Sequence, residues 1–259
     1  MSIPKPKGPD PRYRSPAPPR EASSLDGVLL VDKPAGPTSH DIVAAIRKHF
    51  NIGKVGHGGT LDPQATGLLV ILLGKGTKLS SVFMSGDKAY DGTMTLGIET
   101  NSQDADGEVT REREWRGVTC ERAAEAMQRY VGDMMQTPPM VSAVKIKGVP
   151  LYKSARQGET IERKARFIHV YRFDITECAL PQISFHVDCT KGTYVRTLCA
   201  DVGADLECGA HLSALRRTGS GPLKLEDARP FDAVMEMDED ALKKVVLPLA
   251  RFVAATSNS

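Results

Sequence analysis

The sequence predicts an α+β fold with a mixed, largely antiparallel sheet flanked by helices and loops. Extended runs and helical patterns alternate without the regular strand–helix–strand order of a parallel sheet, and no internal repeat is present. The chain has 259 residues, of which 41% are hydrophobic, so it can bury a large core. No apolar run reaches the roughly 18 to 20 residues that cross a bilayer, which argues against a membrane protein and favours the cytoplasm.

The first structured segment is expected near Leu25. Residues 1–24 contain seven of the 17 prolines and almost no apolar side chains, so we interpret them as a disordered tail. Val28–Val31 has the continuous apolar character of a buried strand. Ser39 is the expected N-cap of a helix whose apolar residues continue at helical spacing to Phe50.

The later segments complete the mixture of strands and helices. Four further runs read as extended: Ala89–Leu96, Phe167–Thr176, Ile183–Cys189 and Leu212–Thr218. Helices are expected near Cys120–Val131 and Tyr194–Leu206. We therefore predict one catalytic domain over residues 25–250, followed by a short C-terminal tail over 251–259.

One motif places an acid in a turn at the edge of the core. Gly56–Pro63 contains Asp62 among three glycines and a proline, which permit unusual backbone angles and close approach by another molecule. The aliphatic run Leu68–Leu73 follows it and predicts a buried strand. An aspartate in such a turn is often only a turn-former, so the motif alone leaves a structural role open.

Several fragments in a fixed order carry a family resemblance. Val55–Pro63, followed by Ala65–Leu69, resembles the catalytic motif of the TruB-type pseudouridine synthases, bacterial enzymes that modify uridine 55 in the T arm of tRNA. Eight flanking fragments across about 190 residues are similar to the same family. They are Gly27–Pro34 with Thr38-Ser39, Tyr90-Asp91-Gly92, Leu96-Gly97, Asp104–Gly107, Pro138-Pro139 with Ser142-Ala143-Lys145, Leu151-Tyr152, Lys191–Arg196 and Leu215–Thr218.

The resemblance implies a pseudouridine-synthase-like fold with an RNA-binding cleft, and it implies site residues. Asp62 is the implied nucleophile. An ionised carboxylate in a pocket that excludes water needs a nearby cation, and the resemblance assigns that place to Arg196. A surface arginine at the start of a helix is the alternative.

Five residues are implied to hold the flipped base or its surroundings. Tyr90 is expected to stack on the uracil and to take the C5 proton, so it counts as both catalytic and substrate-binding. Tyr194 and Leu215 are expected to complete the pocket, although both could be core residues. His57 is expected to enter the RNA loop or contact the base, and Lys33 to brace the active-site loop or a phosphate.

No cofactor is expected. The five cysteines form no CxxC pair and are odd in number, so we predict neither a disulfide nor a structural zinc, and the six histidines lack ligand spacing. Gly74–Thr77 lacks features of a phosphate-binding loop, so no nucleotide is predicted. The isomerisation itself needs neither metal nor redox group.

The charge distribution indicates an RNA partner. The net charge is only +2, but Lys145–Arg172 holds eight basic residues against two acids, whereas Glu226–Asp240 holds seven acids and one arginine. Such asymmetry would orient a polyanion. We expect the tRNA T arm as partner, no obligate protein partner and a monomer.

Two departures from the family pattern bear on these expectations. Gly58 stands where some relatives have threonine, which predicts a looser loop. Only about 30 residues follow Pro230, which predicts no complete PUA domain and weaker binding to the acceptor side of tRNA.

Other functions remain open from the sequence. One is a catalytic subunit that uses a guide RNA, another is an RNA-folding protein in which catalysis is incidental, and the third is a hydrolase that pairs Asp62 with a second acid. For the hydrolase no second carboxylate stands out at a motif position.

Overall fold

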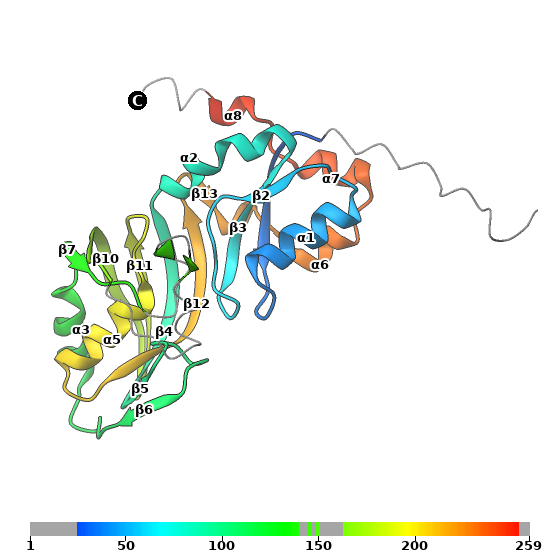
Figure 1. The fold of residues 1–259 in the computed structure, drawn as a ribbon. Helices are drawn as coiled ribbons and strands as arrows, with labels where there is room; N and C mark the ends of the chain where they lie inside the picture. Colours follow the sequence, from blue (N-terminus) through cyan, green and yellow to red (C-terminus); the bar gives the residue numbers. More distant parts are fainter. Residues whose placement is uncertain (1–24, 140–144, 147–148, 151–162, 254–259) are drawn as a thin grey trace, which may run out of the picture.

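The computed structural model describes residues 25–139, 145–146, 149–150 and 163–253, and its architecture is α+β around one mixed sheet (Figure 1). The predicted tail over residues 1–24 lies outside the described residues. The main sheet has ten strands. Eight follow one another across it: β14 (Arg229–Pro230), β1 (Gly27–Lys33), β3 (Thr66–Leu73), β12 (Ala210–Ser220), β4 (Lys88–Leu96), β11 (Gln182–Cys189), β10 (Arg166–Ala179) and β7 (Gly132–Gln136). Two pair beside this path: β2 (Val55–His57) with β3, and β13 (Leu223–Lys224) with β12.

The sheet is largely antiparallel, as predicted. Among the described strands, β1 with β14 and β3 with β12 are the parallel pairs. The central strand β4 pairs along its length with β11 and β12, and Tyr90 lies opposite Val187 on one side and Arg217 on the other. The middle of the sheet therefore brings the Tyr90 and Leu215–Thr218 fragments together.

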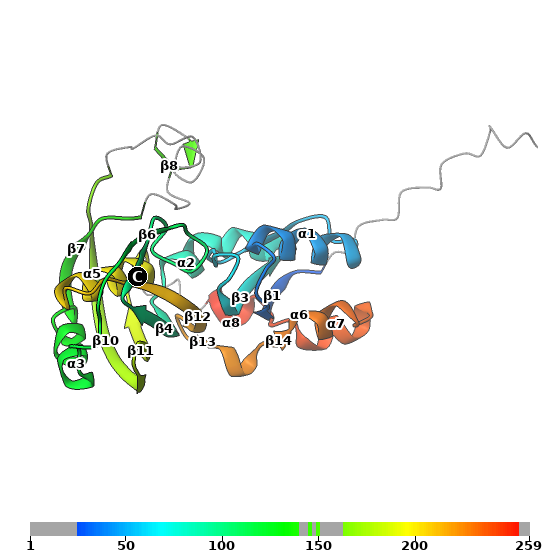
Figure 2. The same cartoon turned by 90° about the horizontal axis from the view of Figure 1, so that it is seen from below.

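Short elements connect and cover the sheet. Two small antiparallel hairpins are β5 (Ile98–Thr100) with β6 (Val109–Glu112), and β8 (Lys145–Ile146) with β9 (Val149–Pro150). The helices are α1 (Ser39–His49), α2 (Ser80–Ser85), α3 (Cys120–Gln128), α5 (Val195–Asp205), α6 (Phe231–Met235), α7 (Glu239–Val245) and α8 (Ala250–Val253). The 3₁₀ turns are η2 (Gly74–Leu79) and η3 (Leu225–Asp227). Helices α1, α6 and α7 lie beside one end of the sheet, and α3 and α5 beside the other (Figure 2).

Helix α1 begins one residue earlier than the sequence predicts. The N-cap is Thr38, whose hydroxyl accepts from the Asp41 N–H while the Asp41 carboxylate accepts from the Thr38 N–H, a complete capping box. Ser39 is already helical and buried, with its hydroxyl turned toward the loop that follows. Both Thr38 and Ser39 are good N-cap residues. Thr38 is the cap because Asp41, three positions after it, completes the capping box.

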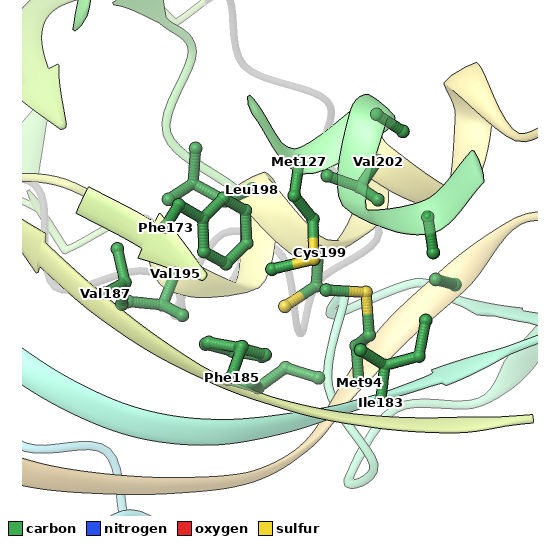
Figure 3. Packing of buried hydrophobic residues seen from close by; sticks show 14 of the residues in the cluster. Met94, Met127, Phe173, Ile183, Phe185, Val187, Val195, Leu198, Cys199 and Val202 are labelled. Atoms are coloured by element: carbon green, nitrogen blue, oxygen red, sulfur yellow. The ribbon is translucent and has the colours of Figure 1, made fainter. Parts of the chain in front are cut away.

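Three clusters of buried side chains form the core. The largest packs α3 and α5 against β4, β10, β11 and β12, and Figure 3 shows Phe173, Phe185 and Leu198 within it. The other two lie on opposite sides of β1 and β3: Leu29 packs with α1, whereas Val28 packs with Phe83 of α2. Side chains alternate across a strand, so covering both faces explains the continuous apolar run of β3.

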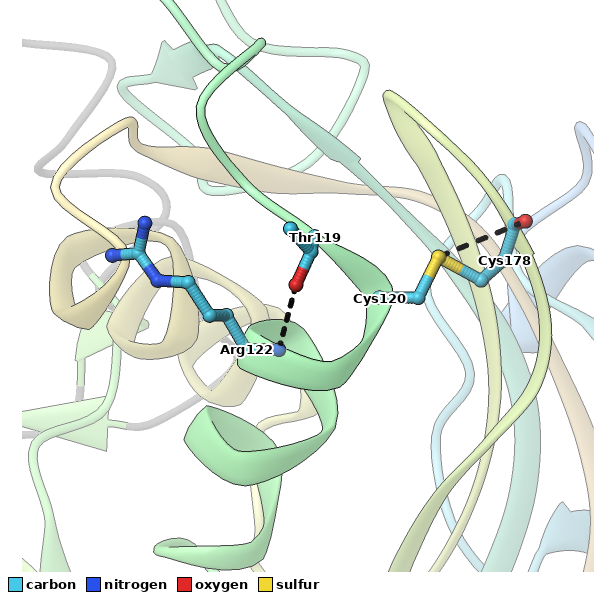
Figure 4. Close-up of a disulfide and its surroundings, with 4 residues drawn as sticks. All are labelled: Thr119, Cys120, Arg122 and Cys178. Carbon is cyan, nitrogen blue, oxygen red and sulfur yellow. Dashed lines mark hydrogen bonds between the residues drawn. A yellow bond between two sulfur atoms is a disulfide. The ribbon is translucent and has the colours of Figure 1, made fainter.

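The prediction of no disulfide is wrong. Cys120, the first residue of α3, is bonded to Cys178 near the end of β10, with a Cα–Cα distance of 6.1 Å (Figure 4). The pair is separated by 58 positions, and only the packing of α3 on β10 brings the two residues within bonding reach. Cys189, Cys199 and Cys208 are free and buried.

The two charged stretches lie at different ends of the sheet. The acidic stretch supplies the N-cap and first turn of α7, at the α6–α7 end. The basic stretch enters the edge strand pair β10–β7, although residues 147–148 and 151–162 lie outside the described part of the chain. Among the described helices, none is long and apolar enough to span a bilayer.

Candidate active site

The connection between β2 and β3, residues 58–65, displays Asp62 on an anchored loop. The Asp62 side chain is 50% exposed, whereas Leu61 and Ala65 on either side of it are each 4% exposed. The Ala65 N–H donates to the Asp62 carbonyl and closes a turn at the acid. The loop therefore presents the carboxylate while its neighbours are packed into the core.

Ser39 ties this loop to helix α1. Its hydroxyl donates to the Leu61 carbonyl at 3.1 Å and accepts from the Leu61 N–H at 2.9 Å. Both polar groups of the residue before Asp62 are thus satisfied by one buried side chain. This two-way bond fixes the backbone next to the acid and explains why Ser39 is not used as the cap.

Lys33 braces the loop from the end of β1. The side chain is fully buried, and its ammonium donates to the carbonyls of Pro34, Pro63 and Ala65, each at 2.8 Å. Burial lowers the pKa of Lys33 to about 8, against the opposing effect of the Asp62 charge. All three ammonium hydrogens are used by backbone, so the geometry supports the loop-bracing alternative rather than a phosphate contact.

Arg217 of β12 holds the other side of the loop. It is 2% exposed, and its guanidinium donates to the carbonyls of Gly59 (3.2 Å), Thr60 (3.2 Å) and Leu68 (2.7 Å). Gly67 makes this approach possible: its φ is +98°, and a Cβ there would collide with the Arg217 backbone. Lys33 and Arg217 together clamp both arms of the loop.

A buried guanidinium faces Asp62 from α5. Arg196 is 5% exposed at its side chain; its Nη2 lies 3.2 Å from Asp62 Oδ2, and its Nη1 lies 3.0 Å from Asp104 Oδ2. Nη1 also donates to the Ser102 carbonyl at 3.0 Å. The arginine is therefore fixed from behind and places its charge beside Asp62, not on the surface.

Tyr90 and Leu215 lie between the two large core clusters on the α1 and α5 side of the sheet. Each is partly buried and packs against both clusters. Tyr90 lies opposite Arg217 where β4 pairs with β12. Burial raises the pKa of the Tyr90 phenol, the Arg217 charge opposes this effect, and the Asp62 charge adds to it.

His57 and Tyr194 occupy the margins of the site. His57 ends β2, and burial, followed by the charges of Arg217 and His40, lowers its pKa, which favours the neutral imidazole. Tyr194 is the partly buried N-cap of α5, two residues before Arg196. Its backbone N–H and carbonyl are both bonded to the Gln136 side chain.

Gly58 does not loosen the loop in the way the sequence suggests. Its N–H donates to the Val70 carbonyl at 2.8 Å, and a Cβ at this position would lie 2.6 Å from the Phe83 Cβ. The space for a side chain is taken by α2, so glycine is required here by packing.

Sequence reasoning missed two residues of the site. Asp104 lies in the Asp104–Gly107 fragment and Arg217 in the Leu215–Thr218 fragment. Both fragments contribute to the family resemblance, but the sequence analysis assigns no role to either residue. Asp104 is the second carboxylate of the site beside Asp62, which the sequence did not single out. Its Oδ2 accepts a hydrogen bond from Arg196. Among the described residues, no group of three or more His, Cys, Asp or Glu side chains is arranged to hold a metal ion.

The mixed sheet and the arginine-paired aspartate on a clamped loop agree with the class of protein that the sequence motifs resemble, the pseudouridine synthases. Comparison with known proteins agrees: residues 47–195 match the TruB family pseudouridylate synthase N-terminal domain, and residues 196–254 match the tRNA pseudouridylate synthase B C-terminal domain. The chain belongs to the TruB family, whose members isomerise uridine to pseudouridine in tRNA.

The relatives cover most of the chain. A protein of Opitutus terrae is 52% identical over 87% of this chain and 93% of its own length, and one of Burkholderia mallei is 47% identical over 87% and 72%. Both are described as tRNA pseudouridine synthase B. A chain of the crystal structure of a Cbf5–Nop10–Gar1 complex is 32% identical with a TM-score of 0.68; the match covers 86% of this chain and 60% of that one.

Proposed function

We propose that this enzyme converts uridine 55 in the T loop of tRNA to pseudouridine, with Asp62 as nucleophile and without metal or nucleotide. The observation that carries the proposal is the contact between the half-exposed Asp62 carboxylate and the buried Arg196 guanidinium at 3.2 Å. An ionised carboxylate at an accessible position beside a fixed cation is suited to attack a sugar carbon. The position of the uridine follows from the family resemblance.

The proposed reaction rearranges bonds within one nucleotide. The bond from N1 to C1′ breaks as Asp62 engages C1′, the uracil turns, and C5 joins C1′ as the aspartate leaves. The C5 proton is then lost and N1 gains a proton, so nothing is added or removed. Arg196 holds the Asp62 charge before attack and after release, while Tyr90 receives the C5 proton.

Access to the base requires that the uridine leave its stack, which costs a few kcal/mol. In the proposed complex Tyr90, Leu215 and Tyr194 surround the extruded uracil, and His57 occupies the space that the base vacates. A neutral imidazole suits this task because no charge must be desolvated within the RNA loop. Asp62 is half exposed, so the bound RNA excludes water from it.

The likeness to the Cbf5-containing complex favours a second candidate, a catalytic subunit that acts within a larger assembly. Activity on bare tRNA separates the two. The stand-alone enzyme modifies purified tRNA without accompanying protein or guide RNA, whereas a subunit does not.

The proposal is tested by tritium release from tRNA carrying 5-tritiated uridine, in buffer with EDTA and no nucleotide. We expect release by the wild type and none by Asp62→Asn. A tRNA with cytidine at position 55 should give none with either protein. Release from that tRNA would overturn the site assignment, and full activity of Asp62→Asn would overturn the nucleophile.

A further inference from the structure

Gln136, the last residue of β7, holds the residue at which α5 begins. Its Nε2 donates to the Tyr194 carbonyl at 3.1 Å, and its Oε1 accepts from the Tyr194 N–H at 2.7 Å. Gln136 is only 4% exposed. One buried side chain therefore satisfies both the N–H and the carbonyl of a residue that lies 58 positions away in the sequence.

The chain after Gln136 explains why a side chain makes these bonds. Gln136 is the last residue of β7 to pair with β10, where it lies opposite Arg166. Pro138 and Pro139 follow shortly after it and have no N–H to donate, so β7 cannot continue as a paired strand. The amide of Gln136 thus carries the hydrogen bonding of β7 on to the start of α5, where the backbone pairing has ended.

Helix α5 lacks a side-chain cap of its own. Tyr194 is the N-cap, and within the described part of the chain its side chain makes no capping hydrogen bond. The usual N-cap residues are serine, threonine, asparagine and aspartate, whose oxygens accept from the first turn. The Tyr194 carbonyl also accepts from the N–H groups of Thr197 and Leu198. A shift of Tyr194 would therefore move the first turn of the helix with it.

This first turn carries the cation of the site. Arg196 lies two positions after Tyr194, and its Nη2 is 3.2 Å from Asp62 Oδ2. A second glutamine holds the same turn one residue beyond Arg196, since Gln103 Oε1 accepts from the Thr197 hydroxyl at 2.9 Å. Side-chain amides thus fix the backbone on both sides of Arg196, from which its guanidinium extends.

We propose that Gln136 is a positioning residue of the reaction, which acts through the first turn of α5 to set the place of Arg196 beside Asp62. The inference rests on the proposed function, in which Arg196 holds the charge of Asp62 before attack and after release. A misplacement of about 1 Å in a site can lower a rate on the order of 100-fold, so a small movement of this turn would slow the chemistry.

The test compares single-turnover rates of pseudouridine formation at saturating tRNA, together with urea unfolding of each variant. Gln136→Met keeps the approximate size of the side chain and removes both bonds. Gln136→Asn keeps both polar groups on a side chain that is one methylene shorter. Gln128→Met is the matched control, because Gln128 also joins two elements through its amide, which donates from α3 to the Phe173 carbonyl of β10 at 3.1 Å.

We expect Gln136→Met to lower the rate by about 10- to 100-fold under conditions in which urea unfolding shows the variant to be folded. Gln136→Asn should lower it less, and Gln128→Met should match the wild type. A wild-type rate in Gln136→Met would overturn the inference. If Gln136→Met does not fold, Gln136→Asn decides by the same criterion.

A double-mutant cycle distinguishes positioning of Arg196 from a general structural role. Arg196→Gln removes the charge whose place Gln136 sets. In that background Gln136→Met should lower the rate by less than about 3-fold, whereas two independent effects would multiply. A full 10- to 100-fold further loss would contradict the inference. If the wild type itself forms no pseudouridine, the proposed function fails instead.

Discussion

Arg196 and Asp62 form an ion pair whose two members have opposite environments: the guanidinium is 5% exposed and the carboxylate 50%. A buried cation with one solvated partner would be poorly compensated. Asp104 supplies the second carboxylate from the other side, at 3.0 Å and 22% exposed. Arg196 is thus held by Asp104 and directed at Asp62.

Changing Asp104 to asparagine should therefore impair chemistry while leaving Asp62 intact. Without the charge of Asp104, Arg196 is drawn toward Asp62 and binds its oxygens more tightly, which weakens the carboxylate as nucleophile. We expect single-turnover tritium release to fall on the order of 100-fold. Asp174→Asn, which breaks the exposed pair with Arg172, is the control and should be silent. Equal rates for the two variants would show that Asp104 does not direct Arg196.

Two adjacent hydroxyls at the start of α1 should separate stability from catalysis. Thr38→Ala removes the helix cap and should cost about 0.5–2 kcal/mol of folding free energy without affecting the rate at saturating tRNA. Ser39→Ala leaves the buried N–H and carbonyl of Leu61 without their partner, which should cost about 1–3 kcal/mol of folding free energy. It also frees the backbone next to Asp62.

The measurement is urea unfolding combined with single-turnover rates for both variants. We expect similar losses of stability but a lower rate for Ser39→Ala alone. A rate loss in Thr38→Ala of the same size would mean that α1 as a whole, not the Ser39 bond, positions the loop.

The sequence predicted the sheet and its main helices because their patterns are local. Apolar runs such as Leu68–Leu73 mark strands covered on both faces, and the glycines around Asp62 mark the loop. What it could not predict depends on contacts between distant segments. The Cys120–Cys178 bond, the second carboxylate at Asp104 and the clamp by Arg217 form only once β10, the β5–β6 hairpin and β12 have taken their places.

Residue identity alone also misassigned two roles. Ser39 has the chemistry of an N-cap, but Thr38 is better placed for the capping box with Asp41. Gly58 suggests flexibility, yet α2 occupies the volume of its missing side chain. In both cases the function of a small residue is decided by its three-dimensional neighbours.

A side chain at Gly58 should displace the loop. Gly58→Ala places a Cβ 2.6 Å from the Phe83 Cβ and 3.3 Å from Val70 Cβ, so we expect a loss of about 1–3 kcal/mol and a lower rate. Phe83→Ala should not rescue it, because the Phe83 Cβ remains. Gly117→Ala, where no atom lies within 4 Å of the added Cβ, is the control for thermal unfolding and activity. Rescue by Phe83→Ala would show that the ring, not the α2 backbone position, excludes the side chain.

Deprotonation of Lys33 at alkaline pH should lower the rate of the reaction without lowering the free energy of unfolding. Its pKa is about 8 in the folded protein, lowered by burial, against 10.5 for an ordinary lysine. Between these values the unfolded chain binds the proton that the folded chain has lost, so the contribution of Lys33 to stability rises with pH. A neutral amine, however, has two hydrogens for three carbonyls, so the loop loses one bond and Asp62 loses a nearby cation.

We therefore expect the single-turnover rate to fall above pH 8, whereas the loss of the Lys33 proton should not lower the urea midpoint of unfolding. Lys33→Met should lower the rate at neutral pH and remove the alkaline decline. Lys88 also has a pKa of about 8, lowered by burial, and donates to the Phe83 and Gly86 carbonyls of the neighbouring turn. Lys88→Met is therefore the necessary comparison: if the decline persists in Lys33→Met and disappears in Lys88→Met, the titrating group is Lys88 and the loop does not depend on the charge of Lys33.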